Sequence, residues 1–479
     1  MEKSPLIYWF RNDLRIQGNT GLSNATASGH PVIPVFIYDQ ASEGDWKYGS
    51  ASKWWLHHSL LSLTKGLREF GSRIIIRSGN SYDVLQQLIK ETGAAGVYWN
   101  RKYEPNIIER DKLIKKDLRE KGLIAKSFNG SLLIEPEDVL NKSNNPFKVF
   151  TPFWKQCLIH LQNNEPKYPK PINKSALNYS PKRLQGFEVS DLKLLPGISW
   201  DTGISASWNP GEAHALQRFD AFCTSGLESY DSKRDIPSLL GTSRLSPHLH
   251  FGEISPIQIW HFLNNHFPDK SWIHSTFISE IGWREFAYNQ LYHFNQITQH
   301  PLKNQFSSFP WENNQEHLEA WQEGRTGFPI VDAGMKELWS TGWMHNRVRM
   351  IAASFLVKQL LIPWQKGSLW FWDTLVDADL ASNSLGWQWV SGCGADAAPY
   401  FRIFNPVLQG EKFDPDGIYI KKWLPELKNF PRKFIHKPWE LSKSHQSEIG
   451  CLLGKDYPLP IADLKNARTR ALTAYKSLG

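Results

Sequence analysis

The sequence predicts two domains of different class: an α/β domain with a doubly wound parallel sheet over residues 1–134, and an all-α domain over residues 209–479. First, short β-rich runs alternate with amphipathic stretches in the first third of the chain. Second, six prolines fall between Pro166 and Pro210, which predicts a long linker over residues 135–208 that crosses the surface. Third, helical periodicity with few β-branched runs dominates after this linker.

Four strands and three helices are expected in the α/β domain. The predicted strands are the apolar runs Leu6–Phe10, Val32–Tyr38, Arg73–Arg77 and Gly96–Asn100. Amphipathic patterns predict helices near Ala51–Phe70, Ser81–Glu91 and Asn106–Lys121. Because the strand runs are apolar throughout, helices should cover both faces of the sheet, as in parallel sheets.

The composition is that of a globular chain with an excess of basic and aromatic residues. Its 479 residues include 55 Lys and Arg against 47 Asp and Glu, so the net charge is +8 and the isoelectric point is near 9.0. This balance favours an anionic partner. The 22 Trp exceed what a core needs. Four cysteines, far apart and without a CxxC pair, favour a reducing compartment over a disulfide framework or zinc ribbon.

No targeting or membrane segment is expected. Charged residues interrupt the N-terminal apolar run, which predicts that there is no signal peptide, and no apolar stretch approaches membrane-spanning length. We therefore expect a cytoplasmic protein that is not secreted and has no membrane partner.

The common signatures for nucleotides and metals are missing from the sequence. There is no GxGxxG after the first strand and no GxxxxGK[ST]. The pairs His57-His58 and His248/His250 have no carboxylate or Cys cluster nearby that would complete a metal site. No metal is therefore predicted, and we interpret these residues as core or surface histidines.

The segment Gly241-Thr-Ser-Arg-Leu-Ser-Pro247 places hydroxyls and an arginine directly before a predicted helix. Ser246 could cap this helix and Pro247 could begin it. Free N–H groups at a helix N-terminus and nearby hydroxyls suit a diphosphate. An ordinary capped turn is the alternative, and from this segment alone it is favoured.

A predicted helix places Glu280, Trp283 and Arg284 on one face. This combination suits either a surface ion pair beside a packed Trp, or a site that stacks a flat ring and hydrogen-bonds its edge.

A second helix places Asn346, Arg349 and Met350 on one face, among Ala, Ile and Leu. Polar groups in such surroundings are costly without partners, which favours a pocket.

The segment 377–389 gathers carboxylates and an amide beside two indoles: Asp377, Asp379, Asn383, Trp387 and Trp389. Taken alone, a buried polar network with core aromatics is as good an interpretation as a site.

Together these segments resemble the photolyase/cryptochrome family. GTSRLSP, SEIGWREF, RTGFPIVDAGMKELWSTGWMHNRVRM, DADLASNSLGWQW and GADAAPYFRIFNPVLQGEKFDP resemble its flavin domain, and Tyr8-Trp-Phe-Arg-Asn-Asp-Leu-Arg15 resembles its antenna domain. The match runs in the family's order from about residue 6 to about residue 460. The chain resembles microbial cyclobutane pyrimidine dimer (CPD) photolyases of class I or class III type. HLHFGEIS, VDAGMKELW and FWDTLVDADL also resemble the subgroup near plant cryptochromes.

The resemblance implies an antenna-chromophore domain over residues 1–134 and a helical domain over residues 209–479 that binds a U-shaped FAD. Asp377 would pair with Arg349 beside the isoalloxazine, and Asn383 would face flavin N5. The positions that match the family's FAD-binding residues are Tyr230, Thr242, Ser243, Arg244, Leu245, Ser246, Arg284, Asn346, Arg349, Asp377, Asp379 and Asn383.

The implied activity is light-driven repair of CPDs in UV-damaged DNA, a carbon–carbon lyase reaction. Excited reduced FAD would donate an electron to a dimer flipped out of single- or double-stranded DNA, and the electron would return after the ring splits. The resemblance also implies a monomer, associated with the nucleoid when bound to DNA.

Motif positions further imply a role for each residue of the lesion pocket and of an electron relay. Glu280 would hydrogen-bond the pyrimidine edge, which favours a protonated carboxyl in an apolar site. The dimer would stack on Trp283 and Trp389, in a cavity that Asn346 and Met350 also line. The relay from the surface to the flavin would use Trp311, Trp364 and Trp387.

Three rival functions are weighed against CPD repair. Cryptochrome-type blue-light receptors of plants carry Asp at the position of Asn383, Tyr at that of Trp389, and a long tail, so three features favour the enzyme. A (6-4) photolyase uses His pairs where this chain keeps Asn346 and Met350. A basic helical nucleic-acid-binding protein without catalysis would carry no yellow flavin.

The subgroup resemblance implies 5,10-methenyltetrahydrofolate as the antenna chromophore, with 8-hydroxydeazaflavin as the alternative. The segment Asn100–Pro105 fits an antenna domain, and so does the cluster of Trp54, Trp55, His57 and His58. Both patterns occur with more than one chromophore. Ile107 departs from the pattern, because some folate-binding members place a pterin-holding Glu there.

Overall fold

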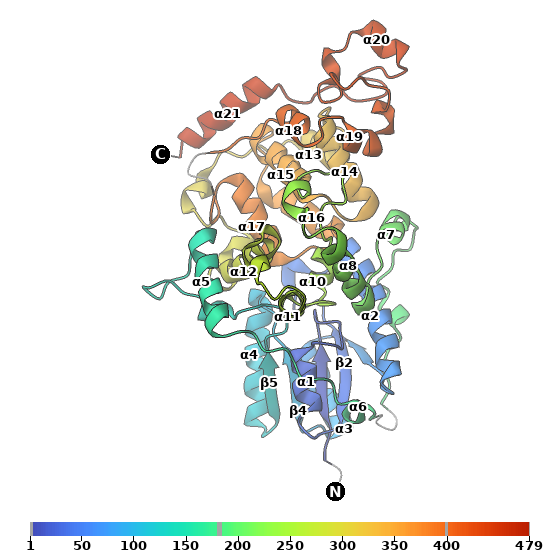
Figure 1. Cartoon of the computed structure of the whole chain (residues 1–479), viewed down its shortest axis with the longest axis vertical. Helices are drawn as coiled ribbons and strands as arrows, with labels where there is room; N and C mark the ends of the chain where they lie inside the picture. The colour runs from blue at the N-terminus through green and yellow to red at the C-terminus, as the bar shows by residue number, and fades with distance from the viewer. Residues whose placement is uncertain (1–2, 180–183, 398–400, 479) are drawn as a thin grey trace.

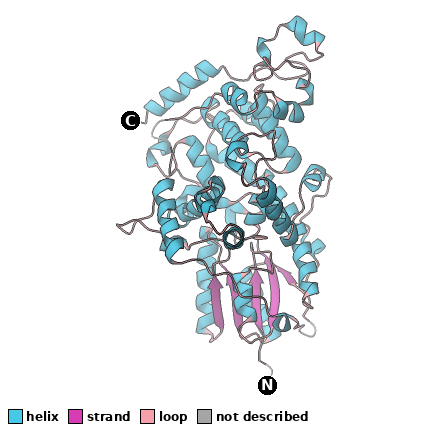
Figure 2. Ribbon diagram, viewed as in Figure 1, coloured by secondary structure: helices cyan, strands magenta, loops and turns pink. Residues whose placement is uncertain are grey.

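The computed structural model describes residues 3–179, 184–397 and 401–478. An α/β part with the N-terminus lies at one end of the long axis, and helices fill the rest (Figures 1 and 2). The elements α20 (Lys443–Glu448) and α21 (Leu464–Lys476) lie at the opposite end from the sheet.

The sheet has five parallel strands in the order β3-β2-β1-β4-β5. They are β1 (Leu6–Phe10), β2 (Val32–Tyr38), β3 (Ile75–Ser78), β4 (Gly96–Asn100) and β5 (Ile124–Phe128). The connecting helices are α1 (Thr20–Thr26), α2 (Ser50–Glu69), α3 (Ser81–Thr92) and α4 (Pro105–Glu120). The order reverses at β1, so the predicted doubly wound parallel sheet is confirmed.

Two elements of this part were not expected from the sequence. β5 is an edge strand in which only Ala125 is buried, so its residues show no apolar run. α1 has seven residues, too few to show helical periodicity, and begins where the Asn19 side chain accepts from the amide of Leu22. β3 begins two residues later than predicted.

The predicted linker of residues 135–208 contains three helices: α5 (Phe150–Asn163), α6 (Lys174–Leu177) and α7 (Thr202–Ser207). The expectation of a connector on the surface is wrong for α5. Its apolar residues recur at helical spacing and are buried against the helical part: Phe150, Phe153, Trp154, Cys157 and Leu161.

The helical part begins with α8 (Glu212–Ser225), α9 (Tyr230–Lys233), α10 (Ser246–His250), α11 (Pro256–His266), α12 (Thr276–His293), α13 (Gln315–Gln322) and α14 (Pro329–Thr341). It continues with α15 (Asn346–Ser354), α16 (Trp364–Thr374), α17 (Leu380–Ser391), α18 (Pro406–Phe413) and α19 (Ile418–Trp423). A π turn, η7 (Phe355–Gln359), extends α15. Among the described residues, no helix combines the length and apolarity needed to cross a membrane.

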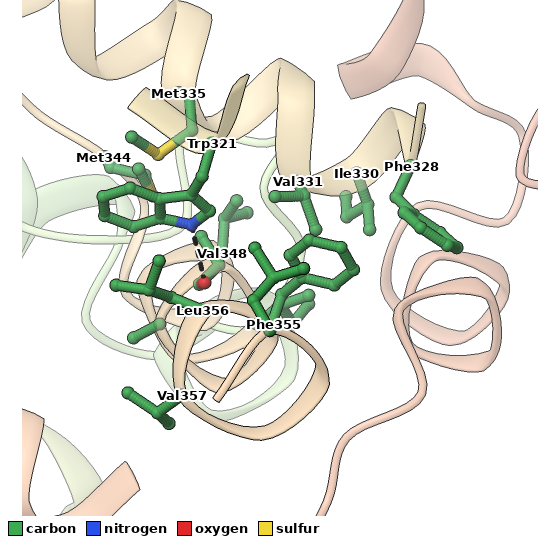
Figure 3. Packing of buried hydrophobic residues seen from close by; sticks show 14 of the residues in the cluster. Trp321, Phe328, Ile330, Val331, Met335, Met344, Val348, Phe355, Leu356 and Val357 are labelled. Carbon is green, nitrogen blue, oxygen red and sulfur yellow. Dashed lines mark hydrogen bonds between the residues drawn. The ribbon is translucent and has the colours of Figure 1, made fainter. Parts of the chain in front are cut away.

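A large apolar core fixes α14, α15 and α16 relative to one another. Figure 3 shows Trp321 packed among Met335, Met344, Val348 and Leu356, with its indole N–H donating to the Ala352 carbonyl at 2.9 Å. The central helices α12 and α17 pack against each other, and both bury residues on most of their faces.

Buried carboxylates hold the α/β part against the helical part. Glu253 accepts from the indole of Trp55 on α2 at 3.1 Å and from the amide of Gly211 at 2.7 Å. Glu285 on α12 accepts from the amides of Leu133 and Ile134 at 3.0 and 3.3 Å. Burial raises the pKa of Glu285 to about 7, although these amides and Arg284 oppose the shift.

We predict that Glu285 makes stability depend on pH between about 4.5 and 7. Its folded pKa lies above its usual value of 4.5, so the stabilisation present below pH 4.5 is lost as pH rises through 7. The free energy of unfolding falls by roughly 3 kcal/mol once Glu285 is fully ionised. Calorimetric melting from pH 4 to 8 should show a midpoint that falls with pH more steeply in the wild type than in Glu285→Gln, in which other buried carboxyl groups with raised pKa, such as Asp332, still titrate.

The control is Glu228→Gln, because Glu228 is exposed, and its pH curve should parallel that of the wild type. A difference between wild type and Glu285→Gln that does not change with pH would contradict this role.

Candidate functional site

Seven of the predicted site residues line one cavity of about 190 Å³, formed by α15, α16 and α17: Asn346, Arg349, Met350, Asp377, Asp379, Asn383 and Trp387. The expected pair is present, because Arg349 donates to Asp377 at 2.8 Å and also to the Met344 carbonyl at 2.7 Å. The Asp377 oxygen Oδ1 is buried and has no hydrogen-bond partner within the described chain. The cavity therefore offers an unused acceptor to a bound ligand.

Asp379 caps α17 and joins it to two other helices. Its Oδ1 accepts from the Ser382 amide at 2.9 Å. Its Oδ2 accepts from the Tyr288 hydroxyl at 2.5 Å and lies 3.4 Å from Nδ1 of His250. Burial raises the pKa of Asp379. The hydrogen bonds from His250 and Tyr288 and the charges of His250 and Arg284 lower this pKa, and together they outweigh the effect of burial. The net pKa lies well below the usual value of 3.8, so this carboxylate stays ionised.

Asn383 is fixed by the neighbouring helix α16. Its Nδ2 donates to the carbonyl and the hydroxyl of Ser368, at 3.1 and 2.9 Å. Both donor positions of the amide point to Ser368, which leaves the side-chain oxygen of Asn383 for a ligand in the cavity.

The loop 242–246 lies outside this cavity and connects to it through Trp343. The residues predicted to hold a diphosphate, Thr242, Ser243 and Ser246, do not line the cavity, and neither do Tyr230, Arg244 and Leu245. The guanidinium of Arg244 lies over the indoles of Trp208 and Trp343, 4.4 and 4.8 Å from the ring centres. Trp343 in turn lies 5.8 Å from the guanidinium of Arg349.

The prediction that Ser246 caps a helix is wrong. Leu245 occupies the N-cap of the short helix α10, and Ser246 is its first residue. The Ser246 hydroxyl instead accepts from the Trp343 indole at 3.4 Å. The Arg244 backbone just before this helix is left-handed, with φ of 53°.

The predicted lesion residues of α12 already have partners. Glu280 accepts from Arg234 at 2.5 Å, and its side chain is 34% exposed. Glu280 therefore does not lie in the apolar site that was expected, because a guanidinium and solvent surround its carboxyl group. Trp283 stacks on Phe150 of α5, with 3.9 Å between ring centres and 9° between planes.

Trp389 lies apart from Asn346 and Met350, contrary to the expectation of one shared cavity. It lines a separate cleft of about 670 Å³, together with Lys148, Lys303, Arg402 and Asp396. Helix geometry is the reason, because residues two apart on a helix point about 200° apart. Trp387 therefore faces the first cavity and Trp389 the basic cleft.

The three tryptophans predicted as a relay share one core. The ring of Trp387 lies against Gly367, where an added Cβ would come within 2.1 Å of it. Trp364 stands one turn before Gly367 on α16 and is 1% exposed, and Trp311 packs on the same cluster while partly exposed. Trp321 and Phe371 also flank Trp387, at 6.2 and 5.0 Å.

Arg284 points to the seam between the two parts of the molecule. It donates to the Ser131 carbonyl at 2.6 Å and lies over the ring of Tyr288. Sequence reasoning missed Tyr288, His250 and Ser368 as partners of the cavity residues. Tyr288 carried a signal, because it stands four residues after Arg284 on the same helix face.

Comparisons with known proteins agree with this arrangement. Family models for DNA photolyase and for the FAD binding domain of DNA photolyase match residues 6–172 and 277–477. The deoxyribodipyrimidine photo-lyase of Agrobacterium fabrum is 47% identical, over 100% of this chain and 99% of that protein. Cryptochrome-1 of Arabidopsis thaliana is 37% identical, over 97% of this chain and 69% of that protein.

The solved structures give the same result. The crystal structure of a bacterial class III photolyase from Agrobacterium tumefaciens matches with a TM-score of 0.93 and 46% identity, over 100% of this chain and 98% of that one. The chain therefore belongs to the photolyase/cryptochrome family. The predicted family and fold class are confirmed, and residues 277–477 form an FAD-binding domain. The unused oxygens of Asp377 and Asn383 fit a flavin, whose ring edge carries an N–H donor.

We predict that Arg349→Met lowers the affinity for FAD at least tenfold, because it leaves the buried Asp377 carboxylate without its partner. Flavin fluorescence during titration of the apoprotein measures this affinity. The matched control is Arg432→Met, which breaks an exposed Arg432–Asp416 pair of the same 2.8 Å length. Equal FAD affinity in all three proteins would contradict a flavin in this cavity.

Proposed function

We propose that the protein repairs CPDs in UV-damaged DNA under light, the activity of a deoxyribodipyrimidine photo-lyase. The observation that carries the proposal is that α17 has a flavin-type cavity on one side and, on the other, a basic cleft lined by the partly exposed indole of Trp389. Close relatives over the whole chain bear the name of this enzyme.

Within this proposal, the residues of the cavity hold the cofactor and set its surroundings. Bound FAD would supply the light-driven electron that enters the dimer and returns when the two ring bonds have broken. Arg349 holds Asp377 so that its free oxygen can accept from the flavin edge. Asp379 stays ionised and fixes the first turn of α17, which orients Asn383.

The basic cleft would receive the DNA. Lys148, Lys303 and Arg402 line it and would contact phosphates, so affinity should fall as salt rises. A dimer flipped from single- or double-stranded DNA would stack on Trp389, and Glu280 with Arg234 would supply polar contacts near Trp283. We further propose that the protein acts as a monomer in the cytoplasm, on the nucleoid.

The direct test is repair of an oligonucleotide that contains one CPD by the reduced, FAD-loaded protein. Blue light should restore the intact pyrimidines, and no repair should occur in the dark. Binding of this oligonucleotide without repair under light would instead favour a cryptochrome-type function. This function is the second candidate, because the chain is 37% identical to plant cryptochromes.

We also propose 5,10-methenyltetrahydrofolate as a second, light-harvesting chromophore. A cleft of about 240 Å³ lies between loops of the α/β part and residues 295–300 of the helical part, and it is lined by Trp46, Glu43, Glu104, Asn106 and Ile107, among others. Its carboxylates can accept from the amino groups of a pterin, and Trp46 offers a flat wall. Glu43 and Glu104, which both pair with Lys102 at 3.0 and 3.5 Å, would take the place of the Glu that some family members carry at the position of Ile107.

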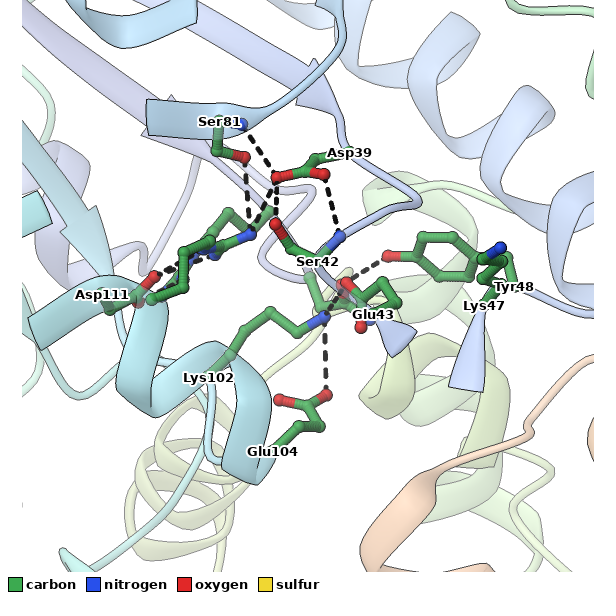
Figure 4. A network of polar contacts seen from close by, with 12 residues as sticks. Asp39, Ser42, Glu43, Lys47, Tyr48, Ser81, Lys102, Glu104 and Asp111 are labelled. Atoms are coloured by element: carbon green, nitrogen blue, oxygen red, sulfur yellow. Dashed lines mark hydrogen bonds and ion pairs between the residues drawn. The ribbon is translucent and has the colours of Figure 1, made fainter. Parts of the chain in front are cut away.

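The alternative chromophore, 8-hydroxydeazaflavin, fits less well. The carboxyl edge of the sheet, where a second flat ring could lie, is filled by charged side chains (Figure 4). Asp39 accepts from Ser42 and Ser81, and Arg11 pairs with Asp111 at 2.5 Å. The cavity beside Arg11 measures only about 20 Å³. Mass spectrometry of the extracted chromophore distinguishes a folate from a deazaflavin, and a deazaflavin would overturn the assignment.

We predict that Asn383→Asp retains FAD but sharply lowers CPD repair. An amide adds no charge near the flavin, whereas a carboxylate repels a reduced anionic flavin if ionised and donates a proton if neutral. Visible spectra under illumination and a repair assay on the same sample measure both effects. Wild-type repair together with wild-type spectra in this variant would remove Asn383 from the mechanism.

We predict that Trp387→Phe largely stops photoreduction of bound oxidised FAD, while repair by chemically reduced protein continues. The substitution keeps a flat apolar ring but removes the readily oxidised indole closest to the cavity. Absorbance during illumination with an external reductant follows photoreduction. Simultaneous loss of both activities would mean that Trp387 has a structural role and that the relay through Trp364 and Trp311 is wrong.

A further inference from the structure

Lys358 is the only buried lysine among the described residues, with 1% of its surface exposed. It belongs to η7, the π turn that extends α15, in which all five residues are buried. Figure 3 shows the preceding Phe355, Leu356 and Val357 packed in the apolar core. Single π turns inside helices often occur at functional sites.

The contacts of Lys358 are with the end of α17 and the loop that follows it. Its Nζ donates to the carbonyl of Ser391, the last residue of α17, at 2.8 Å. The same atom lies 3.0 Å from the ring centre of Phe401. Among the described residues, no carboxylate lies within ion-pair distance of this amine.

Burial of a charged amine costs desolvation free energy, so nearby groups must stabilise the charge of Lys358. A helix C-terminus and an aromatic face both attract a cation. An apolar side chain of similar length would fill the same space without the cost of desolvation. Packing alone therefore does not explain why a lysine stands at this position.

Lys358 and Trp389 line the same narrow cavity of about 20 Å³, together with Val390, Gly392 and Arg402. Trp389 and Arg402 also line the basic cleft of about 670 Å³, which Lys358 does not line.

We propose that Lys358 is a positioning residue for dimer binding: its ammonium anchors the C-terminal end of α17 and the ring of Phe401, and thereby fixes the indole of Trp389. The inference rests on the proposed function, in which the dimer stacks on Trp389. Lys358 touches neither the flavin cavity nor the cleft, and acts through Ser391 and Phe401.

The test compares Lys358→Met, which keeps the apolar stem and removes the charge, with Lys358→Arg, which keeps a charge. Lys366→Met is the matched control, because Lys366 is exposed on α16 and its loss also removes one positive charge. The dissociation constant for an oligonucleotide with one CPD should rise about fivefold to tenfold in Lys358→Met. FAD content, the flavin spectrum and repair at saturating dimer should stay near wild type. Lys358→Arg should recover part of the affinity, and Lys366→Met should keep it.

A pH series separates the charge of Lys358 from its packing. Burial lowers the pKa of Lys358 well below 10.5, although the nearby Cys393 opposes this. The protonated form is thus lost as pH rises through the lowered pKa. The ratio of dissociation constants, Lys358→Met over wild type, should therefore fall toward one as the pH is raised from acid to alkaline values. The other charged or titratable groups that face Lys358, namely Cys393, Lys303 and Arg402, are present in both proteins.

Equal affinity of wild type and Lys358→Met at pH 7, or a ratio that does not change with pH, would overturn the proposal. If Lys358→Met does not fold, wild type and Trp389→Phe are compared over the same pH range. Affinity should then fall at alkaline pH more steeply in the wild type, and parallel curves would overturn the proposal. Absence of CPD-specific binding in the wild type would contradict the proposed function itself, whatever Lys358 does.

Discussion

The carboxylate of Asp379 is the group on which the geometry of the site depends. It caps α17 through the Ser382 amide, accepts from Tyr288 on α12 and lies next to His250 on α10. Three helices from distant parts of the chain thus meet at one ion, whose depressed pKa keeps it charged. Any shift of this carboxylate would move the first turn of α17 and with it Asn383, which is also tied to Ser368.

In the proposed function, the two sides of α17 would let a single helix serve both a cofactor and a nucleic acid. Asn383 and Trp387 face the cavity of about 190 Å³, while Trp389 faces the basic cleft. Spacing of two residues on a helix separates side chains widely around the axis but keeps them within a few ångströms along it. A flavin and a stacked dimer could therefore lie on opposite sides of this helix, with a short path between them for an electron.

The sequence predicted the fold class well because its signals are local. Strands β1, β2 and β4 are apolar runs, and the proline-rich stretch marks the change of domain. It predicted the Arg349–Asp377 pair only through family motifs, because 28 residues separate the partners. The roles of Tyr288, His250 and Ser368 depend on how three helices pack, which periodicity does not encode. Glu280 was expected in an apolar site, because no local pattern shows that Arg234, 46 residues earlier, would reach it.

The most direct measurement is a crystal structure of the FAD-loaded protein bound to DNA that contains one CPD. We expect the flavin ring in the cavity between α15 and α17, with its edge N–H on Asp377 Oδ1 and the side chain of Asn383 beside it. We also expect the dimer against Trp389, with Lys148, Lys303 and Arg402 on the phosphates. A flavin outside this cavity, or a dimer away from the basic cleft, would contradict the proposed function of these residues.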